Sequence, residues 1–212
     1  MGWINLDYLG RALRGSVWLV LLAILSGCIS RTWETNYKDL VARSASDGWY
    51  SADIRVVVPS RLTVSDANVF APKADIVWHG DPKGDRHAQV TQIVEEAARN
   101  ASKALKGRHP VRLEIEVEQF HALSDRARLV APSAVHNLKF KLRVFDMKTG
   151  QQLIPTDLIR ADLPANTRSK ALQADRLGFT QKARITKHLE DVIIGWLRQG
   201  PDPRGTFSAL GR

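Results

Sequence analysis

The chain has 212 residues, of which 44% are hydrophobic and 25% are charged, and its formal net charge is +9 at pH 7. This composition is typical of a globular protein, and the chain shows no internal repeat and no low-complexity segment. Its single cysteine excludes a disulfide framework within the chain and a metal or redox site built on several cysteines.

The N-terminal region contains an apolar run, VWLVLLAILSGC at residues 17–28, that ends at this cysteine. Its uncharged core is about half the ~20 residues that a membrane-spanning helix needs. Arg11 and Arg14 precede the run, and Ser26 and Gly27 close it. A charged start, a short apolar middle and small residues at the end are typical of a secretory signal peptide. A buried core helix would need polar residues at helical spacing, which the run lacks.

The end of this run, Leu-Ser-Gly-Cys at residues 25–28, resembles the lipobox of bacterial lipoproteins in all four positions. The resemblance implies that Cys28 carries a lipid and that residues 1–27 are a signal peptide removed by cleavage before it. Two or more acyl chains anchor a protein stably, at ~0.8 kcal/mol per buried CH₂. The N-terminus therefore predicts a protein anchored to a membrane of the bacterial envelope.

The residues after the cysteine bear on sorting and on domain boundaries. Ile29 and Ser30 follow Cys28, whereas an aspartate in the first of these positions retains lipoproteins in the inner membrane in the best-known sorting system. We therefore expect the periplasmic leaflet of the outer membrane. Residues 28–51 are polar without a sustained period and predict a tether. A Gly-Pro-Asp-Pro stop predicts a disordered tail over 200–212, which leaves one domain at 52–199.

The domain shows strand and helix patterns that alternate along the chain. The predicted elements are, in order, strands at 52–58 and 74–79, a helix at 85–106, strands at 111–117, 138–144 and 153–162, and a helix at 180–198. Pro155 places the strand at 153–162 on an edge of the sheet. These elements predict an α+β fold in which an antiparallel sheet of four to five strands has two helices packed on one face.

The two most regular strands carry opposite charges on their outward positions. One antiparallel register pairs Glu114 with Arg143, Glu116 with Lys141 and Glu118 with Lys139. Such pairs help to set strand register, at about 0.2–1 kcal/mol each. The same register places His121 opposite His136, where two imidazoles could share a metal or form a pH-sensitive latch. Two ligands alone do not make a zinc site, so we favour an ordinary strand-end role.

Residues 79–87, HGDPKGDRH, are the densest polar cluster. His79, Asp81, Asp85 and His87 could ligate a metal, but their spacing matches no known ligand motif. The favoured interpretation is a strand-to-helix turn in which Asp81 or Asp85 caps the helix. The longer segment VWHGDPKGDRHAQV, with the general layout, is similar to uncharacterised small envelope lipoproteins of alphaproteobacteria, a resemblance that implies no activity.

Ser124 is followed by Asp125, but we do not expect these two residues to form a hydrolase site. The chain has no G-x-S-x-G motif and no sign of an oxyanion hole. We therefore predict no catalytic residue, no metal and no cofactor.

The positive charge predicts a partner surface. In a cytosolic protein it would indicate nucleic acid binding. Because an exported chain meets little nucleic acid, we expect an envelope protein, an anionic lipid or a wall polymer instead, with a merely solvated surface as the alternative. Cations without an evident partner in the chain gather before and in the last helix. They are Arg168, Lys170, Arg176, Lys182, Arg184 and Lys187.

Two functions remain open on these observations. The first is a non-catalytic binding or envelope-assembly module held at the membrane by its lipid. The alternative is a lipid-anchored envelope enzyme, a hydrolase or wall-modifying enzyme, with its site near residues 79–87.

Overall fold

The computed structural model describes residues 32–34, 41–203 and 206–208. The predicted signal peptide, Cys28 and part of the predicted tether lie outside these residues, as does part of the predicted tail. Among the described residues, no helix has both the length and the apolar character needed to cross a bilayer.

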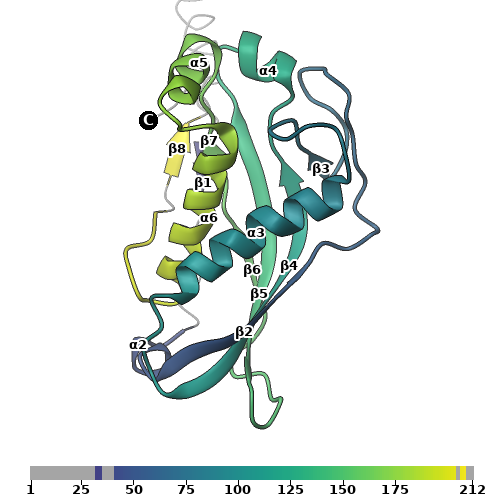
Figure 1. The fold of residues 1–212 in the computed structure, drawn as a ribbon. Coiled ribbons are helices and arrows are strands. Elements are labelled where there is room, and N and C mark those ends of the chain that lie inside the picture. The colour runs from purple at the N-terminus through teal and green to yellow at the C-terminus, as the bar shows by residue number, and fades with distance from the viewer. Residues whose placement is uncertain (1–31, 35–40, 204–205, 209–212) are drawn as a thin grey trace, which may run out of the picture. The chain divides into compact units, whose positions relative to one another are not determined.

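The main sheet has six strands. They are β2 (Trp49–Val57), β3 (Ile76–Val77), β4 (His109–His121), β5 (Val135–Asp146), β6 (Asp157–Arg160) and β7 (Leu163–Pro164). The strand order is β2-β4-β5-β6, with β3 paired to β4 and β7 paired to β5 (Figure 1). A separate two-stranded sheet joins β1 (Thr32–Glu34) and β8 (Thr206–Ser208), so part of the predicted tail has regular structure.

The helices differ widely in length. They are α2 (Arg43–Ser46), α3 (Arg86–Ser102), α4 (Asp125–Val130), α5 (Arg168–Arg176) and α6 (Gln181–Trp196). The two long helices, α3 and α6, pack against each other and cover one face of the sheet (Figure 1). The predicted α+β class is therefore confirmed, with two main helices on one face.

Strand direction differs from the prediction on one side of the sheet. β5 is antiparallel to β4, β6 and β7, as expected, and β6 lies at the edge. In contrast, β2 and β3 run parallel to β4. The helix α3 lies between β2 and β4 in the chain and carries it back along the sheet, as a parallel pair requires. The sheet is thus mixed.

The two long helices begin where the sequence predicts. Asp85 caps α3 by accepting from the backbone N–H of Ala88, and Thr180 caps α6 by accepting from that of Ala183. Their apolar stripes are buried against the sheet together with the large side chains of Trp78 and Trp196. Each stripe is continuous, so the 3.6-residue period predicted both helices.

The predicted β4–β5 register holds over most of its length. Glu114 lies opposite Arg143, and Glu116 lies opposite Lys141. The register then shifts between Val117 and Gln119, at a β-bulge. A bulge adds one residue to one strand and therefore displaces every later pair.

The bulge overturns two predicted pairs. Lys139 lies opposite Gln119 rather than Glu118, and His121 lies opposite Asn137 rather than His136. His136 is buried and pairs with β7. The two imidazoles are thus not neighbours across the strands.

The domain begins earlier than predicted. Trp49, the first residue of β2, is only 5% exposed, and it was expected in the tether. The backbone of Gly107 lies so close to that of Gly48 that an added Cβ would sit 2.0 Å from the Gly48 carbonyl carbon. This contact fixes the start of β2 beside the start of β4, so these residues belong to the folded unit.

Candidate partner-binding surface

The polar loop at residues 79–87 is occupied by internal contacts. The carboxylate of Asp81 accepts from the indole N–H of Trp78 at 2.8 Å and from Lys182 Nζ at 2.9 Å. Burial raises the pKa of Asp81, but the hydrogen bonds from Lys182 and Trp78 outweigh it and hold this pKa below its ordinary value. Asp81 therefore fastens the loop to α6 instead of capping α3, which Asp85 does.

The other loop residues are also tied to their neighbours. His79 Nδ1 lies 3.2 Å from a carboxylate oxygen of Asp125, and His87 Nε2 lies 3.2 Å from the carbonyl oxygen of Leu62. Arg86 is buried and donates to Asp66 at 2.8 Å. Within the described ranges, no three His, Cys, Asp or Glu side chains gather where they could hold a metal ion. The loop has the contacts of a structural turn.

The serine considered for a hydrolase is a helix cap. Ser124 Oγ accepts from the N–H of Ala127 at 3.1 Å and donates to the carbonyl oxygen of Val69 at 2.5 Å. His121 lies 3.1 Å from the carbonyl oxygen of Ala74, on another contact. Ser124 and His121 therefore contact different backbone carbonyl groups, Val69 and Ala74.

The buried His136 lies among cations. Burial, together with the nearby charges of Arg184, His188 and Arg128, lowers the pKa of His136 to about 3. The ring is thus neutral at physiological pH. With His121 opposite Asn137, the two histidines do not form the latch that was weighed against an ordinary strand-end role.

Four of the six cations proposed as a partner surface have partners inside the chain. Lys182 binds Asp81, Arg184 donates to the carbonyl oxygen of Pro164 at 2.9 Å, and Lys187 pairs with Glu190 and Asp191. On α5, Arg168 donates to the carbonyl oxygen of Val130 at 3.0 Å. The expectation that these charges lack partners is wrong for these four.

The remaining two cations of that set differ. Lys170 and Arg176 are exposed on α5 and have no hydrogen bond or ion pair within the described part of the chain. They lie at the end of the domain formed by α4, α5, the turn at 177–179 and the loop segment 68–70 (Figure 1). We refer to these segments together as the α4–α5 end.

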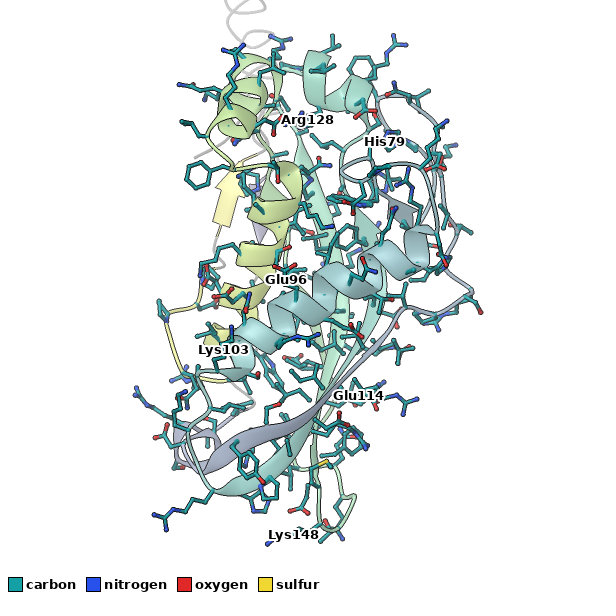
Figure 2. All side chains as sticks on the ribbon, in the orientation of Figure 1. His79, Glu96, Lys103, Glu114, Arg128 and Lys148 are labelled. Carbon is teal, nitrogen blue, oxygen red and sulfur yellow. The ribbon has the colours of Figure 1, made fainter. Side chains whose placement is uncertain are left out.

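Polar contacts join the segments of the α4–α5 end. Asn68 accepts from the backbone N–H of Arg126 at 2.6 Å. Arg128 of α4 forms an ion pair with Asp175 of α5 at 2.5 Å, and Figure 2 shows Arg128 between these helices. These contacts join the loop segment 68–70 to α4 and α4 to α5.

This end also carries exposed apolar side chains that sequence patterns did not single out. They are Val69, Phe70, Leu129, Val130, Leu172, Leu177 and Phe179. The guanidinium of Arg126 lies 5.2 Å from the centre of the Phe70 ring, a cation–π contact. The available signal was local: apolar residues flank Gly178, where turn residues are usually polar.

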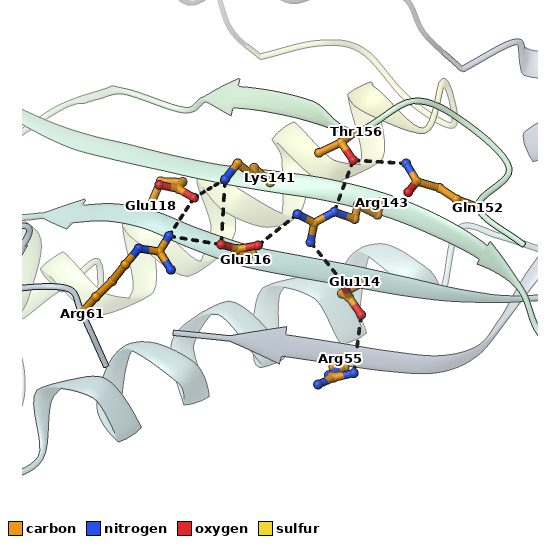
Figure 3. A network of polar contacts seen from close by, with 9 residues as sticks. All are labelled: Arg55, Arg61, Glu114, Glu116, Glu118, Lys141, Arg143, Gln152 and Thr156. Atoms are coloured by element: carbon orange, nitrogen blue, oxygen red, sulfur yellow. Dashed lines mark hydrogen bonds and ion pairs between the residues drawn. The ribbon is translucent and has the colours of Figure 1, made fainter. Parts of the chain in front are cut away.

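The open face of the sheet is polar and internally neutralised (Figure 3). Glu116 accepts from Arg143 at 3.0 Å and from Arg61 at 3.2 Å, and Glu118 accepts from Lys141 at 2.6 Å. The hydrogen bond from Arg143 keeps the pKa of Glu116 below its ordinary value. The charges of this network satisfy one another, whereas Lys139 and Arg160, which lie opposite each other on β5 and β6, are not part of it.

Comparison with solved structures gives low similarity. A variant of the PelC dodecamer from Paraburkholderia phytofirmans is 10% identical with a TM-score of 0.34, covering 82% of this chain and 98% of that chain. A DUF330 protein of Xanthomonas campestris is 12% identical with a TM-score of 0.41, covering 72% and 84%. A candidate lipoprotein of Caulobacter crescentus is 14% identical with a TM-score of 0.29, covering 74% and 94%. These values support no conclusion about function or assembly.

No curated protein matches the sequence. A family model does match it, over residues 49–212. The match begins at the first residue of β2 and includes the whole mixed sheet and the helices α3 to α6. The chain belongs to DUF6778, a family of unknown function.

Proposed function

We propose that this protein is a lipid-anchored, non-catalytic binding module of the bacterial envelope that engages its partner through the α4–α5 end. The lipobox at residues 25–28 supports the anchor and the envelope location, with the periplasmic leaflet of the outer membrane as the site. The observation that carries the binding role is the presence of exposed apolar side chains beside unpaired cations on one ordered end of the domain.

Physical chemistry favours such a surface for recognition. Apolar side chains that gather on a surface mark interaction sites, because their burial against a partner is favourable. Nearby cations raise the rate of association with an anionic partner, and this effect is screened over about 8–10 Å at physiological salt. An anionic lipid, an envelope protein or a wall polymer fits this description.

The contacts of the 79–87 loop support a non-catalytic role. Asp81, Asp85 and Arg86 are used to join the loop to α3, α6 and the preceding segment. A general acid or base must be able to reach a substrate proton, and these groups are already engaged in the fold.

The anchor is tested with Cys28→Ser. Removing the thiol prevents lipid attachment, so we expect the variant to leave the detergent phase in a phase-partition experiment. The unchanged protein should enter that phase and fractionate with outer-membrane markers. A processed Cys28→Ser protein that still enters the detergent phase would show that another feature holds it at the membrane.

The binding surface is tested by site-specific photocrosslinking in the native cell. A crosslinking residue at position 129 would sit on the α4–α5 end, and one at position 158 would sit on β6. Leu129 and Leu158 are matched, since their exposed fractions are 48% and 49%. We expect a discrete crosslinked product from position 129 alone. Products of equal yield from both positions would contradict a dedicated surface.

An enzyme would respond differently. The double variant Asp81→Ala, His87→Ala should leave crosslinking at position 129 unchanged once its fold is confirmed by circular dichroism. Loss of the crosslinked product in this variant, with the fold intact, would favour the 79–87 loop as the functional site.

A further inference from the structure

A groove of about 440 Å³ lies between α5 and the first turns of α6. Side chains from the segment just before α5, from α5 itself, from the turn after it and from α6 line it. Those that matter here are Asn166, Lys170, Gln173, Leu177, Phe179 and Arg184. The lining thus combines two cations, two amides and two large apolar side chains.

The positive charge of the groove is not neutralised by its lining. None of the lining residues is acidic. Lys170 has no partner in the described part of the chain, and Arg184 donates to the carbonyl oxygen of Pro164 rather than to a carboxylate. Asp175, an acidic residue of α5, is paired with Arg128. A cation partly removed from water without a counter-ion favours an anionic ligand.

The apolar side chains are held outward by an ordered turn. The N–H of Gly178 donates to the carbonyl of Asp175 at 2.9 Å, and the N–H of Phe179 donates to that of Ala174 at 2.8 Å. These two bonds form a Schellman motif, with Gly178 in the left-handed region at φ 81°. Leu177 and Phe179 are 66% and 61% exposed, more than any other large apolar side chain described. Their exposure therefore comes from a defined turn and not from a frayed helix end.

We infer that this groove binds the phosphate of an anionic membrane phospholipid through Lys170 and Arg184, while Leu177 and Phe179 enter the apolar edge of the bilayer. The amides of Asn166 and Gln173 supply donors for the remaining headgroup oxygens. The inference rests on the proposed function, because the lipid on Cys28 would keep the domain at a membrane surface. Cations beside exposed apolar side chains are the combination that interfacial binding requires.

The test uses the full lipidated chain in vesicles of phosphatidylcholine, with and without phosphatidylglycerol. Flotation of the vesicles reports the anchor, and amide hydrogen exchange over residues 166–184 reports the groove. We expect protection of this segment only where phosphatidylglycerol is present. Lys170→Gln should raise the phosphatidylglycerol content needed for half protection roughly fivefold, the effect of one cation near an anionic surface.

Two control variants, Arg176→Gln and Leu172→Ser, keep the test specific. Arg176→Gln removes an equally unpaired cation of α5 that does not line the groove, and it should shift this content far less than Lys170→Gln. The double variant Leu177→Ser, Phe179→Ser should abolish most of the protection, whereas Leu172→Ser, on the same helix outside the groove, should retain it. Equal effects of Lys170→Gln and Arg176→Gln would overturn the groove in favour of diffuse charge attraction.

The remaining outcomes separate the two proposals. A protein that fails to float contradicts the anchor, whereas one that floats without protection of residues 166–184 contradicts the groove alone. Equal protection in phosphatidylcholine vesicles would overturn the role of the anionic headgroup. Protection by inorganic phosphate in those neutral vesicles would show that the groove takes a free anion and would overturn the lipid assignment.

Discussion

The open face of the sheet and the α4–α5 end use positive charge in opposite ways. On the sheet face, Arg61, Lys141 and Arg143 lie among three glutamates, and each cation has at least one carboxylate within 4 Å (Figure 3). At the α4–α5 end, Lys170 and Arg176 have no such partner in the described ranges, and Lys170 lines a groove with the exposed apolar side chains of Leu177 and Phe179. The charge of this network therefore serves the fold, and the charge of Lys170 and Arg176 is available to a partner.

The difference shows that net charge and local charge density are poor guides to a binding surface. The basic residues of α6 look as prominent in the sequence as those of α5, yet Lys182 and Lys187 are bound to acidic side chains. What distinguishes the α4–α5 end is the coincidence of unpaired charge with apolar exposure. Predictions that alter one region and leave the other intact sharpen this contrast.

The largest expected effect concerns acid and the buried His136. Its pKa in the folded protein is about 3, below the ordinary 6.5 of an unfolded chain, because burial and the charges of Arg184, His188 and Arg128 disfavour a further cation. The unfolded chain therefore takes up a proton first as the pH falls. The contribution of neutral His136 to the free energy of unfolding is complete above about pH 6.5. It is lost progressively toward pH 3, at about 1.4 kcal/mol per pH unit.

Between pH 6.5 and 4.5 the loss due to His136 should reach about 3 kcal/mol. Urea unfolding of the unchanged protein and of His136→Leu across this range measures it, and the variant should have the flatter profile. The raised pKa of Asp162 opposes this trend in both proteins, so the difference between them isolates His136. Parallel profiles would mean that the imidazole is protonated in the folded state.

The second prediction breaks the charge network on the sheet face. Arg143→Met leaves Glu114 and Glu116 without their shared guanidinium, which donates to them at 3.1 and 3.0 Å. We expect a loss of about 2 kcal/mol in the free energy of unfolding, between the values for exposed and buried pairs. Lys170→Met, the matched change at the α4–α5 end, should alter it by less than about 0.5 kcal/mol.

A second change should relieve part of this loss. Glu116→Gln in the Arg143→Met background removes the carboxylate that the first change leaves uncompensated, so some stability should return. A further loss would show that Glu116 is stabilised mainly by Arg61 and Lys141. Urea midpoints at constant slope give both comparisons.

The third prediction concerns the ion pair between Lys182 and Asp81, which engages Lys182 within the chain. Asp81→Asn takes away the charge that holds Lys182 and weakens the acceptor of the Trp78 indole N–H. A loss of about 1–2 kcal/mol is expected, because hydrogen bonds to charged groups contribute in this range. Lys187→Met breaks only ion pairs within α6, made by a largely exposed lysine, and should cost about 0.5 kcal/mol or less. Thermal unfolding of the two variants compares them directly.

These contrasts also explain what the sequence could predict. Strict alternation and opposite charges located β4 and β5 and fixed their register up to Val117, and the apolar stripes with Asp85 and Thr180 located α3 and α6. No glycine or proline marks the bulge after Val117 in the sequence. Because a shift of one residue reverses side-chain direction in a strand, the bulge turned over the end of β4, so that Phe120 is buried and His121 no longer lies opposite His136.

The binding surface was harder to predict because partners that are distant in the chain decide it. Asp81 and Lys182 are separated by 101 positions, and no local pattern relates them. Helix α5 was missed because it buries only Ala171, so it lacks the apolar stripe that reveals a helix. The same scarcity of buried residues is what leaves Leu172 and Lys170 facing solvent. Hydrophobic periodicity in a sequence reveals the residues that a segment buries, whereas this surface consists of residues that stay exposed.

The smallest expected effect on stability lies at the turn after α5. Leu177 and Phe179 are mostly exposed, so replacing both with serine removes little buried apolar area. We expect the free energy of unfolding to change by less than about 0.5 kcal/mol, because the Schellman hydrogen bonds and Gly178 hold the turn without these side chains. Urea unfolding of the double variant measures this directly. A loss above about 2 kcal/mol, the scale of burying one large apolar side chain, would mean that the two residues pack within the fold. The contrast with Arg143→Met would then disappear, and the α4–α5 end would be part of the core rather than a surface kept for a partner.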